Sequence, residues 1–238
     1  MVTHPTGIHY ADSLSNLVAD YFREKNESVC VRPVGRLDQE TSGIVIFAKN
    51  QVAASRLQSV KSPCKIHKQY LAVVSGALPV DAPDVWHTIN LPLIQDPANH
   101  LKMKTAADLS LHSSVLSGKI KTAVTHYHTL FTSQDWSLVT LKLDTGRTHQ
   151  IRAHLASIGH PLMGDYKYGN ISWNHQYETY GVKTQMLHSY ELHFPQMPKP
   201  LENLSKNVFQ ARVPGKFYRL IKETAWEHGT QEALEVLH

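Results

Sequence analysis

The chain has 238 residues, 42% of them hydrophobic, and a formal net charge of +4. This length can bury the core of one sizeable domain or of two small ones, and no apolar run approaches the ~20 residues of a membrane span. The N-terminus lacks the basic-then-apolar pattern of a secretory signal, and Cys30 and Cys64 lie in unrelated contexts without metal or redox spacing. We therefore expect a reduced, cytoplasmic protein without a disulfide.

The sequence of the first third of the chain predicts two helices and three strands. Apolar residues from Leu14 to Phe22 recur at helical spacing, which predicts a helix over 12–25 with Asp12 or Ser13 as its cap. Apolar and β-branched runs predict strands at 29–31, 44–48 and 69–75, with a short helix at 51–60. Between 79 and 118 prolines break the pattern, and we expect extended segments and a long loop there.

The second half predicts a hairpin followed by a helix. Strands at 122–131 and 136–143 are separated by the turn residues 132–135. Thr148 can then cap a helix that runs to Ile158 and is ended by Gly159. Because strands come in runs and not in regular βαβ alternation, the pattern favours an α+β fold with a largely antiparallel sheet in a single domain over 1–238.

A loop at 35–43, with the sequence Gly-Arg-Leu-Asp-Gln-Glu-Thr-Ser-Gly, places a carboxylate just after an arginine. Arg36 precedes Asp38 by two residues, and Thr41 follows before an apolar strand. An aspartate in a turn-rich loop commonly caps backbone amides. A nearby cation, however, keeps a carboxylate ionised, as a nucleophile requires. Asp38 is therefore a candidate nucleophile.

A second stretch, Leu143-Asp144-Thr145-Gly146-Arg147-Thr148-His149-Gln150-Ile151-Arg152, puts an arginine on a glycine turn before a helix. A cation at this end of a helix opposes the helix dipole. This indicates that Arg147 has a task, either pairing with a carboxylate or holding a phosphate.

These two stretches, with Lys68-Gln69-Tyr70-Leu71-Ala72 between them, resemble the RNA pseudouridine synthases of the RluA family, which modify large-subunit ribosomal RNA and some transfer RNAs. The match runs from His4-Pro5 to about Pro214 and includes Gly159-His160-Pro161-Leu162-Met163-Gly164-Asp165. Gly35 stands where the family usually has histidine. Relatives usually carry a further strand ahead of the His-Pro, and many carry a small RNA-binding module. We expect this chain to lack both.

The resemblance implies a mixed sheet with helices on its faces and a central cleft. It implies the isomerisation of selected uridines to pseudouridine in structured ribosomal or transfer RNA, without a cofactor. Asp38 would be the essential catalytic residue, by attack on the anomeric carbon, by assisting elimination across the sugar or by attack on the uracil ring, and the sequence does not distinguish these routes. Arg147 would pair with Asp38. Tyr70, by default a core aromatic, would lie against the target base and remove the proton from carbon 5. We expect these three residues to meet in one cleft, with Ile151 at its wall.

Basic residues without any acidic residue occupy positions 41–80, namely Lys49, Arg56, Lys61, Lys65 and Lys68. Such a run can be a solvated surface, but beside these motifs it predicts contacts with RNA phosphates, above all through Lys61, Lys65 and Lys68. Arg36 and Arg152 would hold the displaced RNA backbone, and Thr41 and Ile151 would complete the RNA-binding site. We expect a monomer that binds RNA.

Two other function classes are compatible with parts of the sequence. An RNA chaperone of the same fold would bind RNA with little turnover, but the intact Asp38, Tyr70 and Arg147 favour an enzyme. A metal-dependent RNA hydrolase would use some of the 16 histidines, but no His-Glu-x-x-His motif, cysteine pair or acidic third ligand accompanies them. No Gly-rich phosphate loop or dinucleotide motif is present either. We therefore expect neither a metal nor a nucleotide cofactor.

Overall fold

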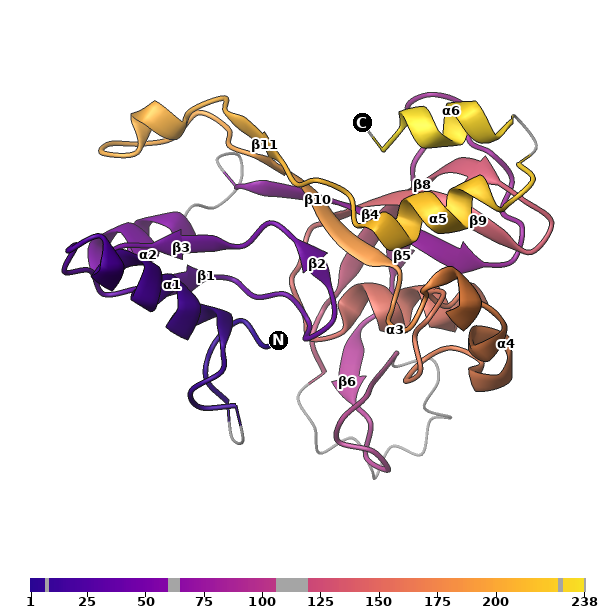
Figure 1. Ribbon diagram of the computed structural model, residues 1–238, viewed down its shortest axis with the longest axis horizontal. Helices are drawn as coiled ribbons and strands as arrows, with labels where there is room; N and C mark the ends of the chain where they lie inside the picture. The colour runs from indigo at the N-terminus through magenta and orange to yellow at the C-terminus, as the bar shows by residue number, and fades with distance from the viewer. Residues whose placement is uncertain (7–8, 60–64, 106–119, 227–228, 238) are drawn as a thin grey trace. The chain divides into compact units, whose positions relative to one another are not determined.

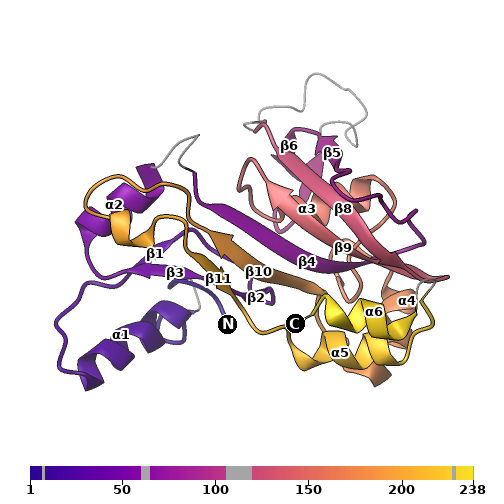
Figure 2. The ribbon, with the colours of Figure 1, turned by 90° about the horizontal axis from the view of Figure 1, so that it is seen from above.

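The computed structural model of the protein describes residues 1–6, 9–59, 65–105, 120–226 and 229–237 (Figures 1 and 2). The chain divides into two compact units, neither of which is a continuous stretch. Unit 1 comprises Met1–His67 and Glu191–Ala211, and unit 2 comprises Lys68–Tyr190 and Arg212–His238. The single domain predicted over 1–238 stays a prediction. Among the described residues, no helix has the length and apolar character needed to cross a bilayer.

Unit 1 combines short helices with short antiparallel strand pairs. It contains α1 (Leu14–Glu24), β1 (Arg32–Val34), β2 (Ser42–Gly43), β3 (Ile46–Ala48), α2 (Gln51–Ser59), the 3-10 helix η2 (Glu202–Leu204) and β11 (Val208–Gln210). The last residues of β10 (Leu187–His193) also belong to unit 1, and its first residues belong to unit 2. β1 runs antiparallel to β3, and β10 runs antiparallel to β11.

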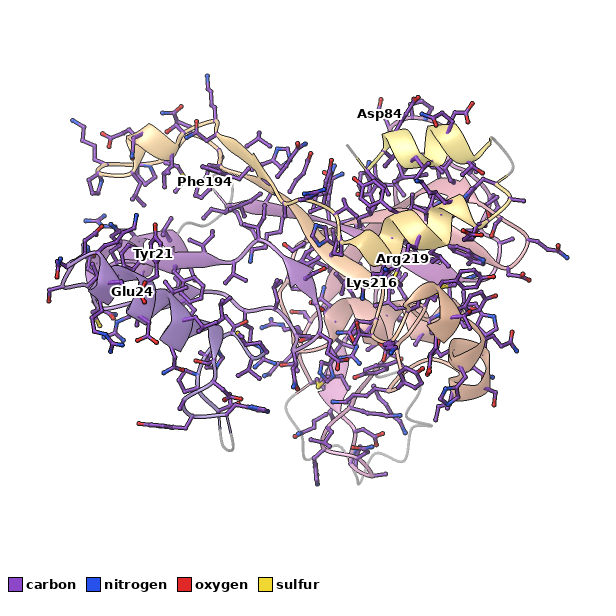
Figure 3. All side chains as sticks on the ribbon, in the orientation of Figure 1. Tyr21, Glu24, Asp84, Phe194, Lys216 and Arg219 are labelled. Carbon is purple, nitrogen blue, oxygen red and sulfur yellow. The ribbon has the colours of Figure 1, made fainter. Side chains whose placement is uncertain are left out.

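The core of unit 1 joins residues from both of its chain segments. Val34 on β1 and Ala48 on β3 share one buried cluster with Leu192 and Phe194 from the second segment. The ring of Phe194, labelled in Figure 3, meets the ring of Phe209 edge-on with 5.7 Å between centroids. The first segment therefore depends on the second to bury its apolar side chains.

Most of the elements predicted for unit 1 are confirmed. The helix predicted at 12–25 is α1, with Ser13 as its N-cap residue, and the helix predicted at 51–60 is α2 as far as the structure describes it. The strand predicted at 29–31 was placed wrongly, because β1 begins at Arg32. The pairing with β3 sets this position: Val34 lies opposite Ile46 and is the buried residue of the strand.

Unit 2 contains the larger sheet. Its elements are β4 (His67–Ser75), β5 (His87–Asn90), β6 (Leu93–Gln95), β7 (Met103–Thr105), β8 (Val124–Thr132), β9 (Trp136–Leu143), α3 (Gln150–Ser157), α4 (Ile171–Gln176), the 3-10 helix η1 (Glu178–Tyr180), α5 (Gly215–Lys222) and α6 (Thr230–Glu235). Strands β4, β9, β8 and β5 are neighbours in this order, and each pair is antiparallel. β6 and β7 form a separate antiparallel pair. The predicted α+β class with a largely antiparallel sheet is thus confirmed.

Helices cover both faces of this sheet (Figure 2). On one face, Val73 of β4 and Leu138 of β9 lie opposite each other and share a buried cluster with Phe217 of α5. Side chains alternate between the faces along a strand, so Tyr70 of β4 and Thr125 of β8 face the other way. On that face Thr125 bonds to side chains of α3.

The hairpin predicted at 122–143 is confirmed, since β8 and β9 pair around the turn at 133–135. The prediction that Thr148 caps the next helix is wrong. α3 begins at Gln150, and His149, in a left-handed conformation with φ of 52°, occupies the N-cap position. The side chain of Gln150 turns back to accept the backbone N–H of Arg147 at 3.0 Å. This bond closes the turn, and the Thr148 hydroxyl is not needed there.

Candidate active site

Asp38 lies in unit 1, in the loop between β1 and β2. The loop leaves the buried Val34 through Gly35, whose φ of 80° is a left-handed conformation that suits glycine. It closes where the N–H of Thr41 donates to the carbonyl of Asp38 at 2.9 Å. Asp38 is half-buried. An acid in this position is held by a short turn while part of its surface stays accessible.

Thr3 fixes the residue immediately before Asp38, a role that no motif in the sequence indicates. The Thr3 hydroxyl accepts the N–H of Leu37 at 3.2 Å and donates to the carbonyl of Leu37 at 3.3 Å. The carbonyl of Thr3 in turn accepts the N–H and the hydroxyl of Ser15, at the start of α1. The loop that carries Asp38 is therefore tied to the first turn of a helix.

Arg147 lies in unit 2, on the turn between β9 and α3. Its Nε donates to the carbonyl of Thr122 at 3.0 Å, and its backbone N–H donates to Gln150. The residue as a whole is exposed. The Nε bond uses one of the five guanidinium donors, and the four on the terminal nitrogens are suited to a carboxylate or a phosphate.

Tyr70 and Ile151 belong to the same face of unit 2. Tyr70 is buried on β4, opposite Leu141 of β9, on the face that α3 covers. Ile151, in the first turn of α3, is also buried, as is Leu155 one turn later. Ile158, which ends the helix, is only half-buried. Both Tyr70 and Ile151 are thus held in packed structure, and Ile151 lies in the helix that follows the turn of Arg147.

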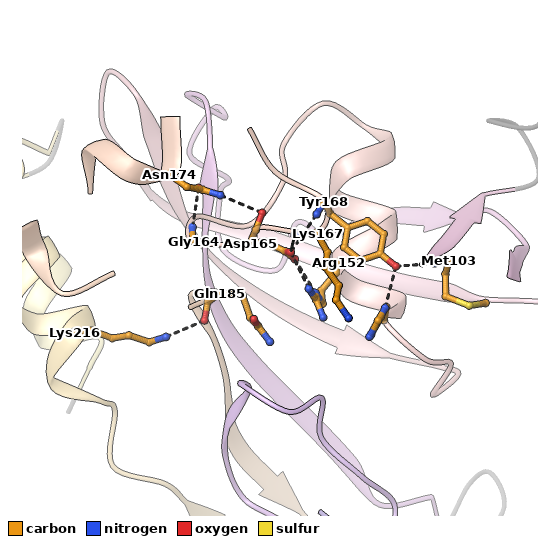
Figure 4. Close-up of polar contacts among 10 residues, drawn as sticks. Met103, Arg152, Gly164, Asp165, Lys167, Tyr168, Asn174, Gln185 and Lys216 are labelled. Atoms are coloured by element: carbon orange, nitrogen blue, oxygen red, sulfur yellow. Dashed lines mark hydrogen bonds and ion pairs between the residues drawn. The ribbon is translucent and has the colours of Figure 1, made fainter. Parts of the chain in front are cut away.

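Arg152 is engaged inside unit 2 (Figure 4). Its Nε and Nη2 donate to the two carboxylate oxygens of Asp165 at 2.7 Å and 2.8 Å, and its guanidinium lies 5.1 Å from the centre of the Tyr168 ring. Asp165 is fully buried and also accepts the N–H groups of Lys167 and Tyr168. The guanidinium of Arg152, which we expected to hold the RNA backbone, is thus paired in the interior with a carboxylate that accepts two of its hydrogen bonds.

The remaining predicted residues are divided between the two units. Arg36 is exposed and Lys65 is half-buried in unit 1. Lys68, in unit 2, is half-buried, and this burial lowers the pKa of its ammonium group. Lys61 lies outside the described residues. Since Asp38 belongs to unit 1, and Tyr70 and Arg147 to unit 2, the predicted meeting of these three residues in one cleft stays a prediction.

Several histidines have partners other than a metal. His126 contacts Asp144 at 2.9 Å, and His128 contacts the carbonyl of Val85 at 2.7 Å. Within the described ranges, no three side chains of histidine, cysteine, aspartate or glutamate are grouped so that they could hold a metal ion.

A family model described as RNA pseudouridylate synthase matches residues 1–157. The chain belongs to this family. It is 35% identical over 217 residues to an uncharacterized RNA pseudouridine synthase of Bacillus subtilis (strain 168), covering 88% of this chain and 67% of that relative. It is 32% identical over 200 residues to the ribosomal large subunit pseudouridine synthase D of Zymomonas mobilis subsp. mobilis, covering 82% and 59%. The chain thus spans roughly two thirds of the length of these relatives.

The fold is shared with a solved structure, that of human RNA pseudouridylate synthase domain containing 4. The TM-score is 0.64 at 22% identity, and the match covers 92% of this chain and 87% of the human chain. Family membership confirms the predicted enzyme class: the protein is an RNA pseudouridine synthase, an isomerase that acts on uridine in RNA.

Proposed function

We propose that this synthase converts specific uridines of a structured ribosomal or transfer RNA to pseudouridine, with Asp38 as nucleophile and without a cofactor. The printed name of the Zymomonas relative favours ribosomal RNA. The observation that carries the proposal is the half-buried Asp38 on a loop tied down on both sides, through Thr3 and Thr41. A carboxylate on an anchored backbone, in a residue that is not sealed in the interior, is suited to attack a carbon atom.

In the proposed reaction, the carboxylate of Asp38 attacks the anomeric carbon of the ribose and the bond to uracil N1 breaks. The detached uracil takes the electron pair, turns, and attacks the same carbon through its carbon 5, which releases Asp38. Tyr70 removes the proton from carbon 5, and a proton returns to N1. No atom is gained or lost, so no co-reactant is consumed. The uridine must first leave its stack, at a cost of a few kcal/mol.

Arg147 supports this reaction by pairing with the carboxylate of Asp38 and keeping it ionised. Its anchored Nε and backbone N–H support this role, because a fixed guanidinium presents its remaining donors in one direction. Arg36, Lys65 and Lys68 contact RNA phosphates, Thr41 and Ile151 help to form the substrate site, and the protein acts as a monomer.

Replacement of Asp38 by asparagine tests the nucleophile. Asparagine preserves shape and hydrogen bonding but removes the charge, so tritium release from RNA labelled at carbon 5 of uracil should disappear while RNA affinity is kept. Glu40→Gln is the matched control, because Glu40 is an exposed acid in the same loop, and it should leave turnover unchanged. Turnover of the Asp38 variant within about tenfold of wild type would contradict the assignment. Absence of tritium release from wild type would favour the chaperone alternative.

A further inference from the structure

The turn that carries Arg147 rests on a buried amide. Oε1 of Gln150 accepts the backbone N–H of Arg147 at 3.0 Å and the hydroxyl of Thr145 at 2.8 Å. Nε2 of the same amide donates to the carbonyl of Val124 at 2.9 Å and to Oγ1 of Thr125 at 3.0 Å. Gln150 is 2% exposed, so water does not substitute for these partners.

His154, one turn along α3, fixes the direction of the bonds behind Gln150. Its Nε2 lies 2.9 Å from the carbonyl of Leu91, and a carbonyl only accepts, so Nε2 carries the proton. His154 is fully buried, and this burial lowers the pKa of its imidazole. The ring is therefore neutral near pH 7, and Nδ1 is an acceptor.

The hydroxyl of Thr125 lies 2.9 Å from Nδ1 of His154, and it must donate its single proton there. Its oxygen can then only accept from Gln150, which orients the amide with Nε2 toward Thr125 and Oε1 toward Arg147. Each link thus determines the next, and the bonds run in one direction from Gln150 to Leu91. A reversal at any link would leave two donors or two acceptors facing each other in a buried space.

We propose that Thr125 and Gln150, oriented by His154, are positioning residues for Arg147. They do not touch the RNA; they set the place and direction of the guanidinium through its backbone. This inference rests on the proposed role of Arg147 in turnover. If these bonds had a purely structural role and only joined α3 to β8, variants of Thr125 or Gln150 would lose stability but show no specific loss of kcat.

The test compares Thr125→Val, which keeps the shape and removes the hydroxyl, with Thr125→Ser, which keeps the hydroxyl. Thr125→Val should lower kcat by about 10- to 100-fold, because a displacement of 1 Å is enough for such a loss. KM for RNA should stay within about twofold, since the ground-state contacts with RNA are unchanged. Thr125→Ser should restore kcat to within about threefold of wild type. Equal kcat for the valine and serine variants would overturn the inference.

The decisive measurement repeats Thr125→Val in an Arg147→Ala background. If Thr125 acts through Arg147, the second substitution should change kcat no further, because the group it positions is gone. The same loss in both backgrounds would overturn the inference. If Arg147→Ala alone keeps full turnover, it is the proposed role of Arg147 that fails.

Thr145→Val provides a second variant in case Thr125→Val does not fold. Thr145 is half-buried, and its hydroxyl is the other donor to Oε1 of Gln150. It should show the same selective loss of kcat, which Thr145→Ser should reverse. A valine variant with wild-type kcat would count against the inference.

Discussion

Asp165→Asn should destabilise unit 2 strongly, although the side chain barely changes in size. In the native protein the carboxylate accepts Nε and Nη2 of Arg152 and two backbone N–H groups. In the variant one oxygen remains, and an amide N–H₂ that faces Arg152 would set donor against donor. The guanidinium then stays buried without its counter-ion.

The exposure of the pair determines the magnitude. The side chain of Arg152 is 7% exposed and that of Asp165 is 0% exposed, so solvent screens this interaction weakly. Removing one partner of a buried pair costs about 3–5 kcal/mol, a large part of the ~5–15 kcal/mol that stabilise a typical protein. For a chain of this size, the loss corresponds to a fall in Tm of roughly 6–20 °C.

Urea unfolding followed by tryptophan fluorescence is the assay. All four tryptophans, Trp86, Trp136, Trp173 and Trp226, belong to unit 2, so the signal reports the unit that carries the substitution. Asp135→Asn is the control, because Asp135 is exposed in the β8–β9 turn, and it should change stability by less than about 0.5 kcal/mol. A loss below about 1 kcal/mol for Asp165→Asn would refute the reasoning and leave Arg152 available for RNA.

Three further outcomes are expected. Thr3→Val should lower kcat about tenfold and Thr3→Ser should not, since only the hydroxyl holds the loop before Asp38. Equal kcat values for the two variants would show that the bonds from Thr3 to Leu37 do not matter for turnover. Burial lowers the pKa of His154, so its contribution to the free energy of unfolding is present above the unfolded pKa of about 6.5 and is lost as the pH falls through the folded pKa. The difference in stability between wild type and His154→Gln should therefore shrink below about pH 6.5. A difference that does not change with pH would contradict the burial of His154 as its cause. Lys65→Ala and Lys68→Ala should each reduce the slope of log affinity for RNA against log salt by about one, and unchanged slopes would place the RNA elsewhere.

The elements that could be predicted are those whose apolar residues follow a helical spacing or form a continuous β-rich run. α1 follows from apolar residues at helical spacing, although none of them is fully buried, and β9 follows from an apolar and β-branched run that is buried on both faces. The start of α3 was missed, since the left-handed His149 and the returning side chain of Gln150 decide it. A glutamine in sequence gives no sign of which backbone group it will bond.

The environment of Arg152 could not be predicted for a related reason. Its partner Asp165 lies in a turn beside Gly164, whose φ is 72°. A Cβ on Gly164 would collide with the carbonyl oxygen of Thr184, so this turn depends on a close approach between distant segments. Local patterns do not report such contacts. Thr3 was overlooked likewise, because its partner Leu37 is 34 residues away.

The interrupted course of the chain through unit 1 has a consequence for its biosynthesis. Val34 and Ala48 are made early, but Leu192 and Phe194, which cover them, leave the ribosome only after positions 68–190 have been made. At about 5–20 residues per second, the delay is roughly 6–25 s. During this time the first segment has no complete core, so the nascent chain should be a chaperone client until residue 211 has emerged.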